Sequence, residues 1–370
     1  MTGRRLTVVQ LLPALSAGGV ERSTLEIGAA LAAAGHRSVV ISAGGRQVER
    51  LLAQGSEHVA LDIGRKSVFT LRQVGALRRL FADLKPDIVH ARSRLPAWLA
   101  WRALRKPPAS KTHFVTTVHG LNSPGWYSSI MTRGERVICV SNTVRDHVLR
   151  HYPHIAPARL TVIPRGVDPA EFPFGYAPDD AWRRGFAEHF PQLSGGMLLT
   201  LPGRGTRLKG HADAIELLAG LVARGLDCKL LLLGAQEPGR EAYLRELRAL
   251  AQQRGVAERV VISPPRDDVR EIYAVSNLVL QLSTKPEAFG RTVIEAIALC
   301  RPVLGYAHGG VGELLAELYP DGRVPPGDIT RLVERAAELL RLAPSIAPLK
   351  QFRLADMQAA TLDLYAQMAG

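Results

Sequence analysis

Residues 6–34 of this chain read LTVVQLLPALSAGGVERSTLEIGAALAAA. The stretch opens with a short apolar run, passes through the adjacent glycines Gly18 and Gly19, and continues with helical spacing of its apolar residues. A buried strand that turns through glycine into a helix is the first part of a β-α-β unit, the building block of parallel sheets. The chain repeats this pattern at Met197–Leu201, which leads into the glycine-rich segment 202–210. The sequence therefore predicts two units of the same doubly wound kind.

Further apolar runs of strand length continue each unit. The strands expected in the first half, all of them buried, are Leu6–Leu12, Ser38–Ala43, Val59–Ile63, Ile88–Ala91, Phe114–Val118 and Arg136–Val140. Those expected in the second half are Met197–Leu201, Lys229–Leu233, Val260–Ile262, Leu278–Leu282 and Pro302–Tyr306. Helical stretches lie between them, among them Val20–Ala34, Phe69–Leu84 and 210–224. The pattern predicts an α/β fold of two facing, Rossmann-like, doubly wound domains.

Prolines mark the join between the two domains. Pro164, Pro169, Pro173 and Pro178 follow the β-rich segment Leu160–Ile163, and such clusters are typical of linkers. We expect a first domain over residues 1–168, a second over 169–350 and a terminal helix in 351–370.

Composition indicates a globular protein and excludes several classes. Of the 370 residues, 46% are hydrophobic and 22% are charged, and no run reaches the roughly 18 apolar residues of a membrane span. The three cysteines lie far apart, which excludes a disulfide framework and a cysteine zinc site and suits a reducing compartment. The apolar run before Pro13 is too short for a secretory signal. We expect a cytoplasmic protein, either soluble or attached to the inner surface of the membrane.

The positive charge is concentrated in the first half of the chain. Residues 1–168 contain 24 Lys and Arg and 10 Asp and Glu, a net charge of +14, whereas the remainder contains 23 and 24, a net charge of −1. This asymmetry predicts an anionic partner for the first half: nucleic acid, acidic lipid headgroups or a phosphorylated acceptor.

An amphipathic helix within residues 64–84 is a candidate contact for that partner. Its cations are Arg65, Lys66, Arg72, Arg78 and Arg79, and its apolar side consists of Val68, Leu71, Val74, Leu77, Leu80, Phe81 and Leu84. The apolar side would pack on the sheet. The arginines would then either meet only water or bind an anionic membrane or a phosphorylated glycan.

Each predicted domain has a glycine-containing loop where its first strand ends. Gly18 and Gly19 open a helix, whose N-terminus favours negative charge, so this loop is either a phosphate site or an ordinary tight turn. The second loop carries Arg204, Arg207 and Lys209. Backbone donors and fixed cations together suit a diphosphate, the alternative being a solvated basic loop.

Two glutamates border a further strand-to-helix turn, in the segment PEAFGRTVIE that ends at Glu295. Glu287 lies in the loop and Glu295 within the following helix, so they are expected to do different work. Glu295 could accept hydrogen bonds from a ribose diol, and the backbone N–H groups of Gly290 to Val293 could hold a phosphate. His119 ends the run Thr116–His119 at the edge of the first sheet, where it is either a substrate contact or a structural histidine.

Together these residues resemble those of the GT-B glycosyltransferases, in particular the large retaining family 4, over nearly the whole chain and most strongly over 200–315. Glu287 and Glu295 match the paired-glutamate motif of the family. The diphosphate loop matches at Arg204 and Lys209, and the N-terminal glycine loop at Gly18 and Gly19. Further matches are His119, the hinge segment 162–168 (VIPRGVD) and the segment 266–273 (RDDVREIY).

The resemblance implies a role for each of these residues. Glu287 and His119 are the expected catalytic residues, which position and stabilise the transferred sugar. The expected donor-binding residues are Gly18, Gly19, Arg204, Lys209, Phe289, Gly290, Arg291, Thr292, Val293 and Glu295. The anomeric configuration would be retained, with no metal and no cofactor beyond the nucleotide-sugar donor. The terminal helix would pack back on the first domain, as in relatives.

Departures from the family pattern affect the hinge and two loops. Arg165 replaces the usual asparagine of the hinge, and Pro264 replaces a glycine near the expected base site. Gly312 stands where a proline is common before Glu313. Pro264 leaves the base of the donor open, and Gly312 loosens the sugar-facing loop Ala307–Gly312.

The resemblance favours an enzyme that extends a glycan or lipid-linked acceptor, with bacterial lipopolysaccharide or another surface polysaccharide as the expected product. A nucleotide-sugar epimerase or hydrolase of the same architecture is the nearest alternative. A nucleic-acid-binding protein is disfavoured because no binding module is recognisable. A nicotinamide oxidoreductase is disfavoured because neither glycine loop fits the dinucleotide fingerprint.

Overall fold

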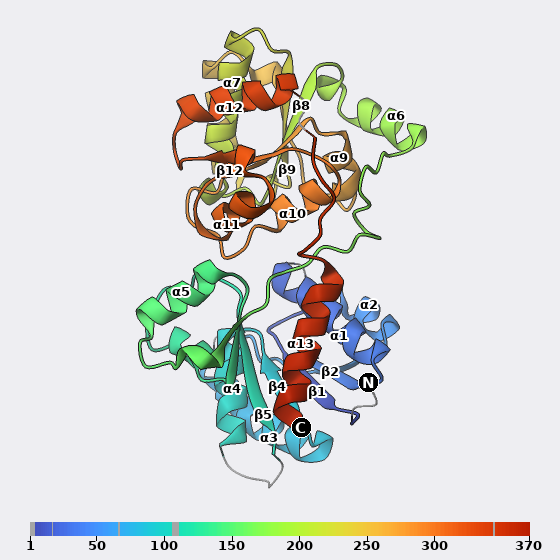
Figure 1. Ribbon diagram of the computed structural model, residues 1–370, viewed down its shortest axis with the longest axis vertical. Coiled ribbons are helices and arrows are strands. Elements are labelled where there is room, and N and C mark those ends of the chain that lie inside the picture. Colours follow the sequence, from blue (N-terminus) through green and yellow to red (C-terminus); the bar gives the residue numbers. More distant parts are fainter. Residues whose placement is uncertain (1–3, 17, 66, 106–110, 343–344) are drawn as a thin grey trace. The chain divides into compact units, whose positions relative to one another are not determined.

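The computed structural model describes residues 4–16, 18–65, 67–105, 111–342 and 345–370. By its internal contacts the chain divides into two compact units. Unit 1 consists of Met1–Arg165 and Leu354–Gly370, and unit 2 consists of Gly166–Arg353. The division falls at Arg165, three residues before the boundary expected from the sequence. Each unit contains a parallel sheet with helices packed on it (Figure 1).

Unit 1 is built on a seven-stranded parallel sheet with the order β3-β2-β1-β4-β5-β6-β7. Its strands are β1 Thr7–Leu11, β2 Arg37–Ser42, β3 Glu57–Ala60, β4 Ile88–Ala91, β5 His113–Val118, β6 Arg136–Cys139 and β7 Leu160–Val162. Its helices are α1 Gly19–Ala33, α2 Val48–Ala53, α3 Gln73–Leu84, α4 Arg94–Leu104, α5 Asn142–His151 and α13 Leu354–Ala369. The direction of the strand order reverses between β1 and β4, which is where doubly wound folds bind ligands.

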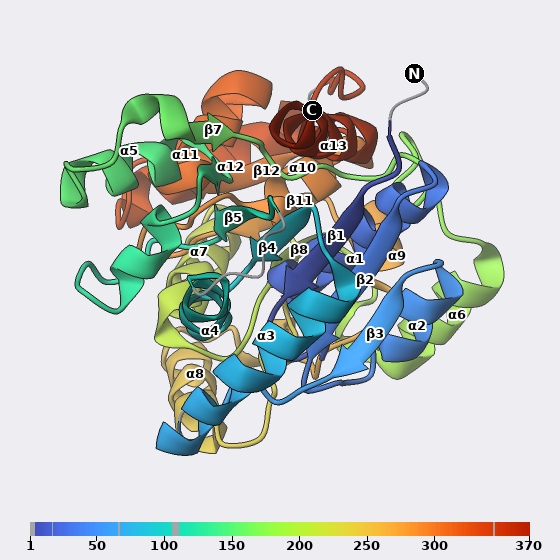
Figure 2. The same ribbon diagram turned by 90° about the horizontal axis from the view of Figure 1, so that it is seen from below.

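The C-terminal helix α13 completes the core of unit 1, where it lies beside α1 (Figures 1 and 2). Met357, Leu364 and Tyr365 join the buried cluster formed by residues such as Val8 and Ile27. His90 of β4 is fully buried, and its Nδ1 lies 2.5 Å from the Tyr365 hydroxyl. The terminal helix is thereby held to the sheet by apolar contacts and by a buried hydrogen bond.

Unit 2 is built on a six-stranded parallel sheet with the order β10-β9-β8-β11-β12-β13. Its strands are β8 Met197–Pro202, β9 Cys228–Leu233, β10 Val260–Ile262, β11 Leu278–Gln281, β12 Val303–Tyr306 and β13 Arg323–Val324. Its helices are α6 Asp180–His189, α7 His211–Ala223, α8 Glu241–Gln253, α9 Val269–Val275, α10 Arg291–Ala298, α11 Gly309–Leu318 and α12 Ile329–Leu342. The two parallel sheets with covering helices confirm the predicted α/β class.

Two local predictions are wrong. The run Val59–Ile63 was expected to be a buried strand, but β3 is an edge strand with exposed ends, because the sheet has no further strand on that side. The helix expected from Phe69 begins at Gln73, after a 3-10 turn over Val68–Arg72. The Thr70 hydroxyl donates to the Arg65 carbonyl at 2.6 Å, which holds the chain in this tighter turn.

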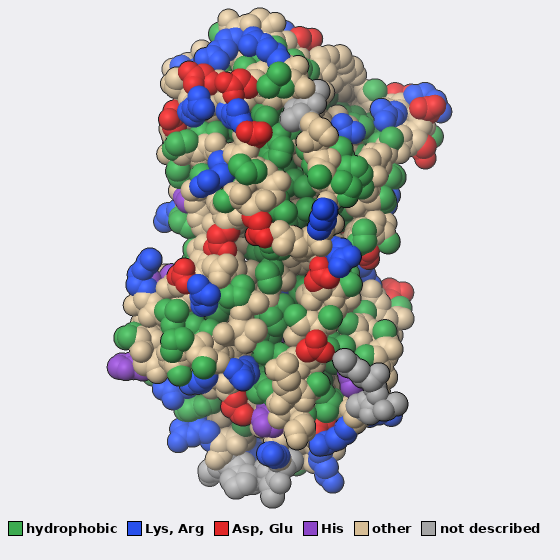
Figure 3. All heavy atoms as spheres, in the orientation of Figure 1, with side chains coloured by type: hydrophobic (Ala, Val, Ile, Leu, Met, Phe, Trp, Pro, Cys, Tyr) green, Lys and Arg blue, Asp and Glu red, His purple; other side chains and the backbone are tan. Residues whose placement is uncertain are grey.

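The basic segment 64–84 therefore separates apolar from charged side chains less completely than the sequence predicts. Leu71, assigned to the apolar side, is 51% exposed, whereas Leu77 and Phe81 are buried as expected. Arg72 and Arg79 are exposed, but Arg78 is turned inward, with a buried Nε that lacks a partner among the described residues. Arg65 is exposed, and Lys66 lies outside the described residues. Lys and Arg side chains line much of the edge of unit 1 in the view of Figure 3.

Within the described ranges, none of the helices has the length and apolar character to span a bilayer.

Candidate active site

At two positions of the segment that follows β8 in unit 2, only glycine fits. A Cβ at Gly205 would lie 2.1 Å from the Ala235 carbonyl oxygen. A Cβ at Gly210, whose φ is +74°, would lie 2.0 Å from the Leu282 carbonyl oxygen. These close approaches place the segment against the ends of β9 and β11, at the carboxyl edge of the sheet.

The three cations of this segment, Arg204, Arg207 and Lys209, differ in what they contact. Arg204 is exposed, and it forms no side-chain hydrogen bond or ion pair with a residue that the structure describes. Arg207 pairs with Glu246 of α8 at 2.5 Å and lies over the Tyr243 ring, 5.1 Å from its centroid. Of the two predicted diphosphate ligands, Arg204 is therefore available as it stands, whereas Lys209 is paired with Glu287.

Lys209 and Glu287 are joined directly. The Lys209 ammonium donates to Glu287 Oε1 at 2.6 Å, and about a quarter of each side chain remains exposed (29% and 26%). The Ser283 hydroxyl donates to the same carboxylate oxygen. The fold thus brings a predicted diphosphate ligand and a predicted sugar-facing residue to one point of unit 2.

Backbone packing holds the Glu287 loop in place. The Gly310 N–H, in the first turn of α11, donates to the Glu287 carbonyl oxygen at 2.8 Å. A Cβ at Gly310 would lie 2.5 Å from Phe289 Cα, so the loop packs against a glycine-only helix start. His308 Nε2 lies 2.7 Å from the Ser283 carbonyl oxygen and must donate to it, because a carbonyl only accepts.

The other predicted donor residues lie at the start of α10. Gly290, with a φ of +117°, is the residue before the helix, and Arg291 and Thr292 are half-buried in its first turn. The Val293 N–H already donates to the Gly290 carbonyl at 3.0 Å, so it could bind a phosphate only by exchanging that bond. Glu295 is only 7% exposed, a buried position that suits recognition rather than solvation.

Phe289 is buried to the same degree as Glu295 and packs against a second aromatic ring. It is 7% exposed, and its ring lies 6.2 Å from that of Phe352, centroid to centroid. In this structure it is chiefly a packing residue, which supports the loop between Glu287 and Gly290.

In unit 1, His119 follows β5 and is paired with the hinge residue Arg165. An Arg165 Nη2 donates to His119 Nδ1. Because a guanidinium only donates, Nδ1 must be the accepting nitrogen and the ring proton lies on Nε2. Burial first, and then the charges of Arg165 and Arg92, hold the pKa of His119 well below its usual value. The histidine is therefore neutral and presents an N–H donor, and Nε2 has no partner among the described residues.

The glycine loop of unit 1 lies beside this histidine. Gly18 precedes α1 with a φ of +142°, and its carbonyl accepts from the Arg22 N–H at 3.0 Å. A Cβ at Gly18 would lie 2.6 Å from a carboxylate oxygen of Glu21, and nothing lies within 4 Å of one at Gly19. Burial raises the pKa of Glu21. The negative charge of this glutamate at the helix N-terminus weakens the case for Gly18 and Gly19 as a phosphate site.

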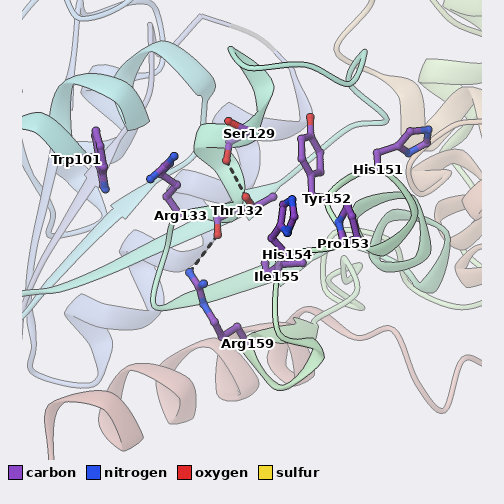
Figure 4. A pocket seen from close by; sticks show the side chains of 10 residues that line it. All are labelled: Trp101, Ser129, Thr132, Arg133, His151, Tyr152, Pro153, His154, Ile155 and Arg159. Carbon is purple, nitrogen blue, oxygen red and sulfur yellow. Dashed lines mark hydrogen bonds between the residues drawn. The ribbon is translucent and has the colours of Figure 1, made fainter.

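Two of the pockets in the described part of unit 1 differ in their relation to the predicted site. A pocket of about 300 Å³ at the carboxyl edge of the sheet is lined by residues that include Glu21, Arg92, Arg94 and His119. A larger pocket of about 540 Å³ lies between the C-terminal end of α4 and the segment after α5, with Trp101, Arg133 and Arg159 on its wall (Figure 4). Only the smaller pocket contains a residue that the sequence predicts to be catalytic.

No three His, Cys, Asp or Glu side chains gather in a possible metal site within the described part of the chain.

The fold and these sites can be compared with those of known proteins. The sequence profile of Glycosyltransferase Family 4 matches residues 17–171, and that of Glycosyl transferases group 1 matches residues 192–351. The chain belongs to the GT-B glycosyltransferases of family 4. The first profile covers most of the N-terminal part of unit 1 and ends six residues into unit 2, and the second lies within unit 2. This glycosyltransferase therefore has the expected succession of an N-terminal and a C-terminal module.

Relatives with curated functions match parts of the glycosyltransferase. A D-inositol 3-phosphate glycosyltransferase of Xylanimonas cellulosilytica is 30% identical over 219 residues, which are 56% of this chain and 51% of that protein. An N-acetyl-alpha-D-glucosaminyl L-malate synthase of Bacillus anthracis is 31% identical over 135 residues, 36% of this chain and 34% of that protein. The matched stretches thus span about half or less of these relatives.

Solved structures match the glycosyltransferase over nearly its whole length. A glycosyltransferase from Rickettsia africae superimposes with a TM-score of 0.81 at 26% identity, covering 98% of both chains. Anabaena Alr3699/HepE superimposes with a TM-score of 0.78 at 18% identity, covering 98% of this chain and 100% of that one. The second likeness shows the fold alone, and the two together confirm the GT-B class.

Sequence reasoning missed several residues that shape these sites. Arg92 and Arg94 directly follow β4, and their place after a buried strand was a signal that could have been used. Ser283 holds Glu287, but a lone serine in a loop carries no recognisable pattern. Arg165 stood out only as a departure from the hinge pattern, and its contact with His119 depends on the tertiary fold.

Proposed function

We propose that this glycosyltransferase moves a sugar from a nucleoside-diphosphate donor to an acceptor hydroxyl with retention of the anomeric configuration. The observation that carries the proposal is the junction in unit 2, where Lys209 of the cationic loop contacts Glu287 at 2.6 Å. A diphosphate held by the first residue would place its attached sugar beside the second. Anabaena Alr3699/HepE, which shares the fold, has been solved with UDP-glucose and with UDP and glucose, which supports a nucleotide-sugar donor.

In the proposed reaction the main task is to stabilise the departing diphosphate. The acceptor oxygen forms a bond to the anomeric carbon while the bond from that carbon to the phosphate oxygen breaks. The acceptor proton passes to the departing phosphate oxygen on the same face, which leaves the configuration unchanged. Arg204 and Lys209 would neutralise the growing charge, and the start of α10 would add backbone donors. These cations supply the charge that a metal would otherwise provide, so the proposal requires none.

The remaining residues would hold the rest of the donor. Glu295, buried in α10, would accept hydrogen bonds from the ribose. Glu287 would face the transferred sugar, where a carboxylate stabilises positive charge that develops at the anomeric carbon. In unit 1, His119 presents a neutral N–H donor to the pocket beside it, which suits a sugar hydroxyl better than it suits proton removal.

For the acceptor we propose a glycan or lipid-linked glycan of the bacterial surface, such as lipopolysaccharide, met at an anionic membrane surface. The support is the excess of basic residues in the first half of the chain and the exposed Arg72 and Arg79. The named acceptors of the curated relatives include an inositol phosphate and malate, so acceptors differ widely among the relatives.

A panel of UDP-, GDP- and ADP-sugars tests the donor proposal by thermal shift. A ligand at a hundred times its Kd stabilises the folded state by about 2.7 kcal/mol, which is a shift of roughly 5–10 °C for units of this size. We expect at least one donor to do so with chelator present. Product anomers identified by NMR would then test retention. Consumption of the donor without an acceptor, at a rate that acceptor does not raise, would favour the hydrolase alternative instead.

A further inference from the structure

The smaller pocket of unit 1 lies where a doubly wound sheet is expected to bind a ligand. It opens at the carboxyl ends of β1, β4 and β5, which carry Pro13, Arg92 and His119 into its wall. The strand order changes direction between β1 and β4. At that point the helices on neighbouring strands diverge, so a crevice forms at the sheet edge.

Arg92 contributes a buried charge to this pocket without a carboxylate beside it. It is 3% exposed; its Nε donates to Gln10 Oε1 at 2.7 Å and its Nη1 to Ser23 Oγ at 3.2 Å. Its Nη2 is buried and has no hydrogen-bond partner among the described residues. Arg92 makes no ion pair within that part of the chain, although the Tyr365 hydroxyl beside it, and Glu26 from a distance, offset part of the cost of its burial. A buried guanidinium held by neutral acceptors alone is costly unless a further anion compensates it.

The groups around Arg92 are donors as well. Because Arg165 donates to Nδ1 of His119, the ring proton lies on Nε2, and this N–H is also buried without a hydrogen-bond partner among the described residues. Arg94 is half-buried at the start of α4 and donates to the Ser128 hydroxyl at 3.1 Å. Ser93, the residue before α4, makes no side-chain cap, and the eleven-residue helix adds the positive end of its dipole.

The wall of this pocket also contains one carboxylate. Glu21, in the first turn of α1, lines the same pocket. The pocket wall therefore contains a hydrogen-bond acceptor as well as cationic donors. A polyol that carries an acidic group would match both, with a hydroxyl toward Glu21 and the acidic group toward Arg92 and Arg94.

We propose that this pocket binds an oxyanion, a phosphate or a carboxylate, on the acceptor molecule. The inference rests on the proposed glycosyltransferase activity and names the class of acceptor: an alcohol that bears a negatively charged group. A phosphate or a carboxylate can accept hydrogen bonds from the unpartnered buried donors and can compensate the net positive charge of the wall, whereas a neutral sugar cannot compensate that charge.

The test is the affinity for inorganic phosphate, measured by 31P NMR or calorimetry at constant ionic strength with chloride as the balancing salt. The background is the double variant Arg204→Ala, Lys209→Ala, so that the proposed donor loop does not contribute. Arg94→Gln is the main variant because the side chain is only half-buried, and Arg92→Lys keeps the charge but loses the planar fork. Arg133→Gln is the matched control, since Arg133 is an exposed arginine of unit 1 in the other pocket. Acetate replaces phosphate in a second arm.

We expect phosphate to bind the background protein, Arg94→Gln to weaken it at least tenfold, Arg92→Lys to weaken it as well, and Arg133→Gln to leave it within twofold. Stronger binding of acetate than of phosphate would assign the carboxylate class. If the background protein binds neither phosphate nor acetate, or if Arg94→Gln and Arg133→Gln lose affinity equally, the inference is overturned. Displacement of phosphate by UDP, GDP or ADP would assign the pocket to the donor and also overturn it. Failure of the donor proposal would show separately, as no binding of any nucleotide sugar to the wild-type chain.

Discussion

The ion pair between Lys209 and Glu287 must open or rearrange when a diphosphate binds, and this makes a counter-intuitive prediction. Replacing a proposed catalytic residue, Glu287→Gln, should tighten the binding of the free nucleoside diphosphate. The glutamine keeps the size of the side chain and removes the charge that competes with phosphate for the Lys209 ammonium.

The size of the effect follows from the geometry. Charges 2.6 Å apart attract by about 1.6 kcal/mol in water and by about 6 kcal/mol at an effective dielectric constant of 20. Desolvation and side-chain entropy cancel most of this, and exposed pairs retain about 0.2–1 kcal/mol. With about a quarter of each side chain exposed, we expect about 1 kcal/mol, a fivefold lower Kd. Transfer should nonetheless fall by at least a hundredfold, because the lost charge acts at the reacting carbon.

Calorimetry with the diphosphate that the wild-type chain binds is the assay. Glu246→Gln is the matched control: it removes the same charge from the neighbouring pair with Arg207, which lies on the same loop and is more exposed. That control should change the Kd by less than twofold. Weaker binding by Glu287→Gln, or equal tightening by both variants, would refute the reasoning.

Three further predictions address other parts of the chain. Glu295→Ala should raise the Kd of the nucleoside diphosphate about tenfold through loss of the ribose contact, and an unchanged Kd by calorimetry would remove that role. Burial lowers the pKa of His211 to about 4. The unfolded chain therefore takes up a proton at this position before the folded chain does, and the free energy of unfolding falls by about 3 kcal/mol as the pH drops from 6.5 toward 4. Urea titrations of His211→Gln should show a free energy of unfolding that depends less on pH over that window, and the same pH dependence as the wild-type chain would contradict this. The chain should sediment with anionic but not neutral liposomes, less so at high salt, and Arg72→Glu with Arg79→Glu should abolish this without changing diphosphate affinity; equal sedimentation with both lipids would argue against a membrane role.

Much of the sheet architecture could be predicted because buried parallel strands are short and uniformly apolar. The run Ile88–Ala91 is predicted with the bounds that the structure gives, since it is buried on both faces. The strand β3 departs from its prediction because it lies at the edge of the sheet, so its burial depends on its place in the strand order. The local sequence does not show that place. The strand β13, Arg323–Val324, is too short to carry a signal of its own.

The candidate site is predictable as a set of loops but not as a set of contacts. The residue types of the cationic loop and of the Glu287 loop point to donor chemistry, yet their contact joins residues 78 positions apart. The pairing of His119 with Arg165 likewise spans 46 positions, and it decides the tautomer of the ring. Arg92 is an unremarkable basic residue in the sequence. Its importance lies in burial without an ion pair in the described part of the chain, which only the packed structure reveals.

The most direct test of the account is a calorimetric titration of UDP, GDP and ADP into the wild-type chain and into Arg204→Ala. Arg204 is exposed and forms no ion pair in the described part of the chain, so its loss should leave the fold intact and remove one charge-assisted contact worth about 1.5–3 kcal/mol. The account predicts that at least one of the three diphosphates binds and that the variant binds it at least tenfold more weakly. If none binds the wild-type chain, or if the variant binds with equal affinity, the donor site is not where this structure places its cations.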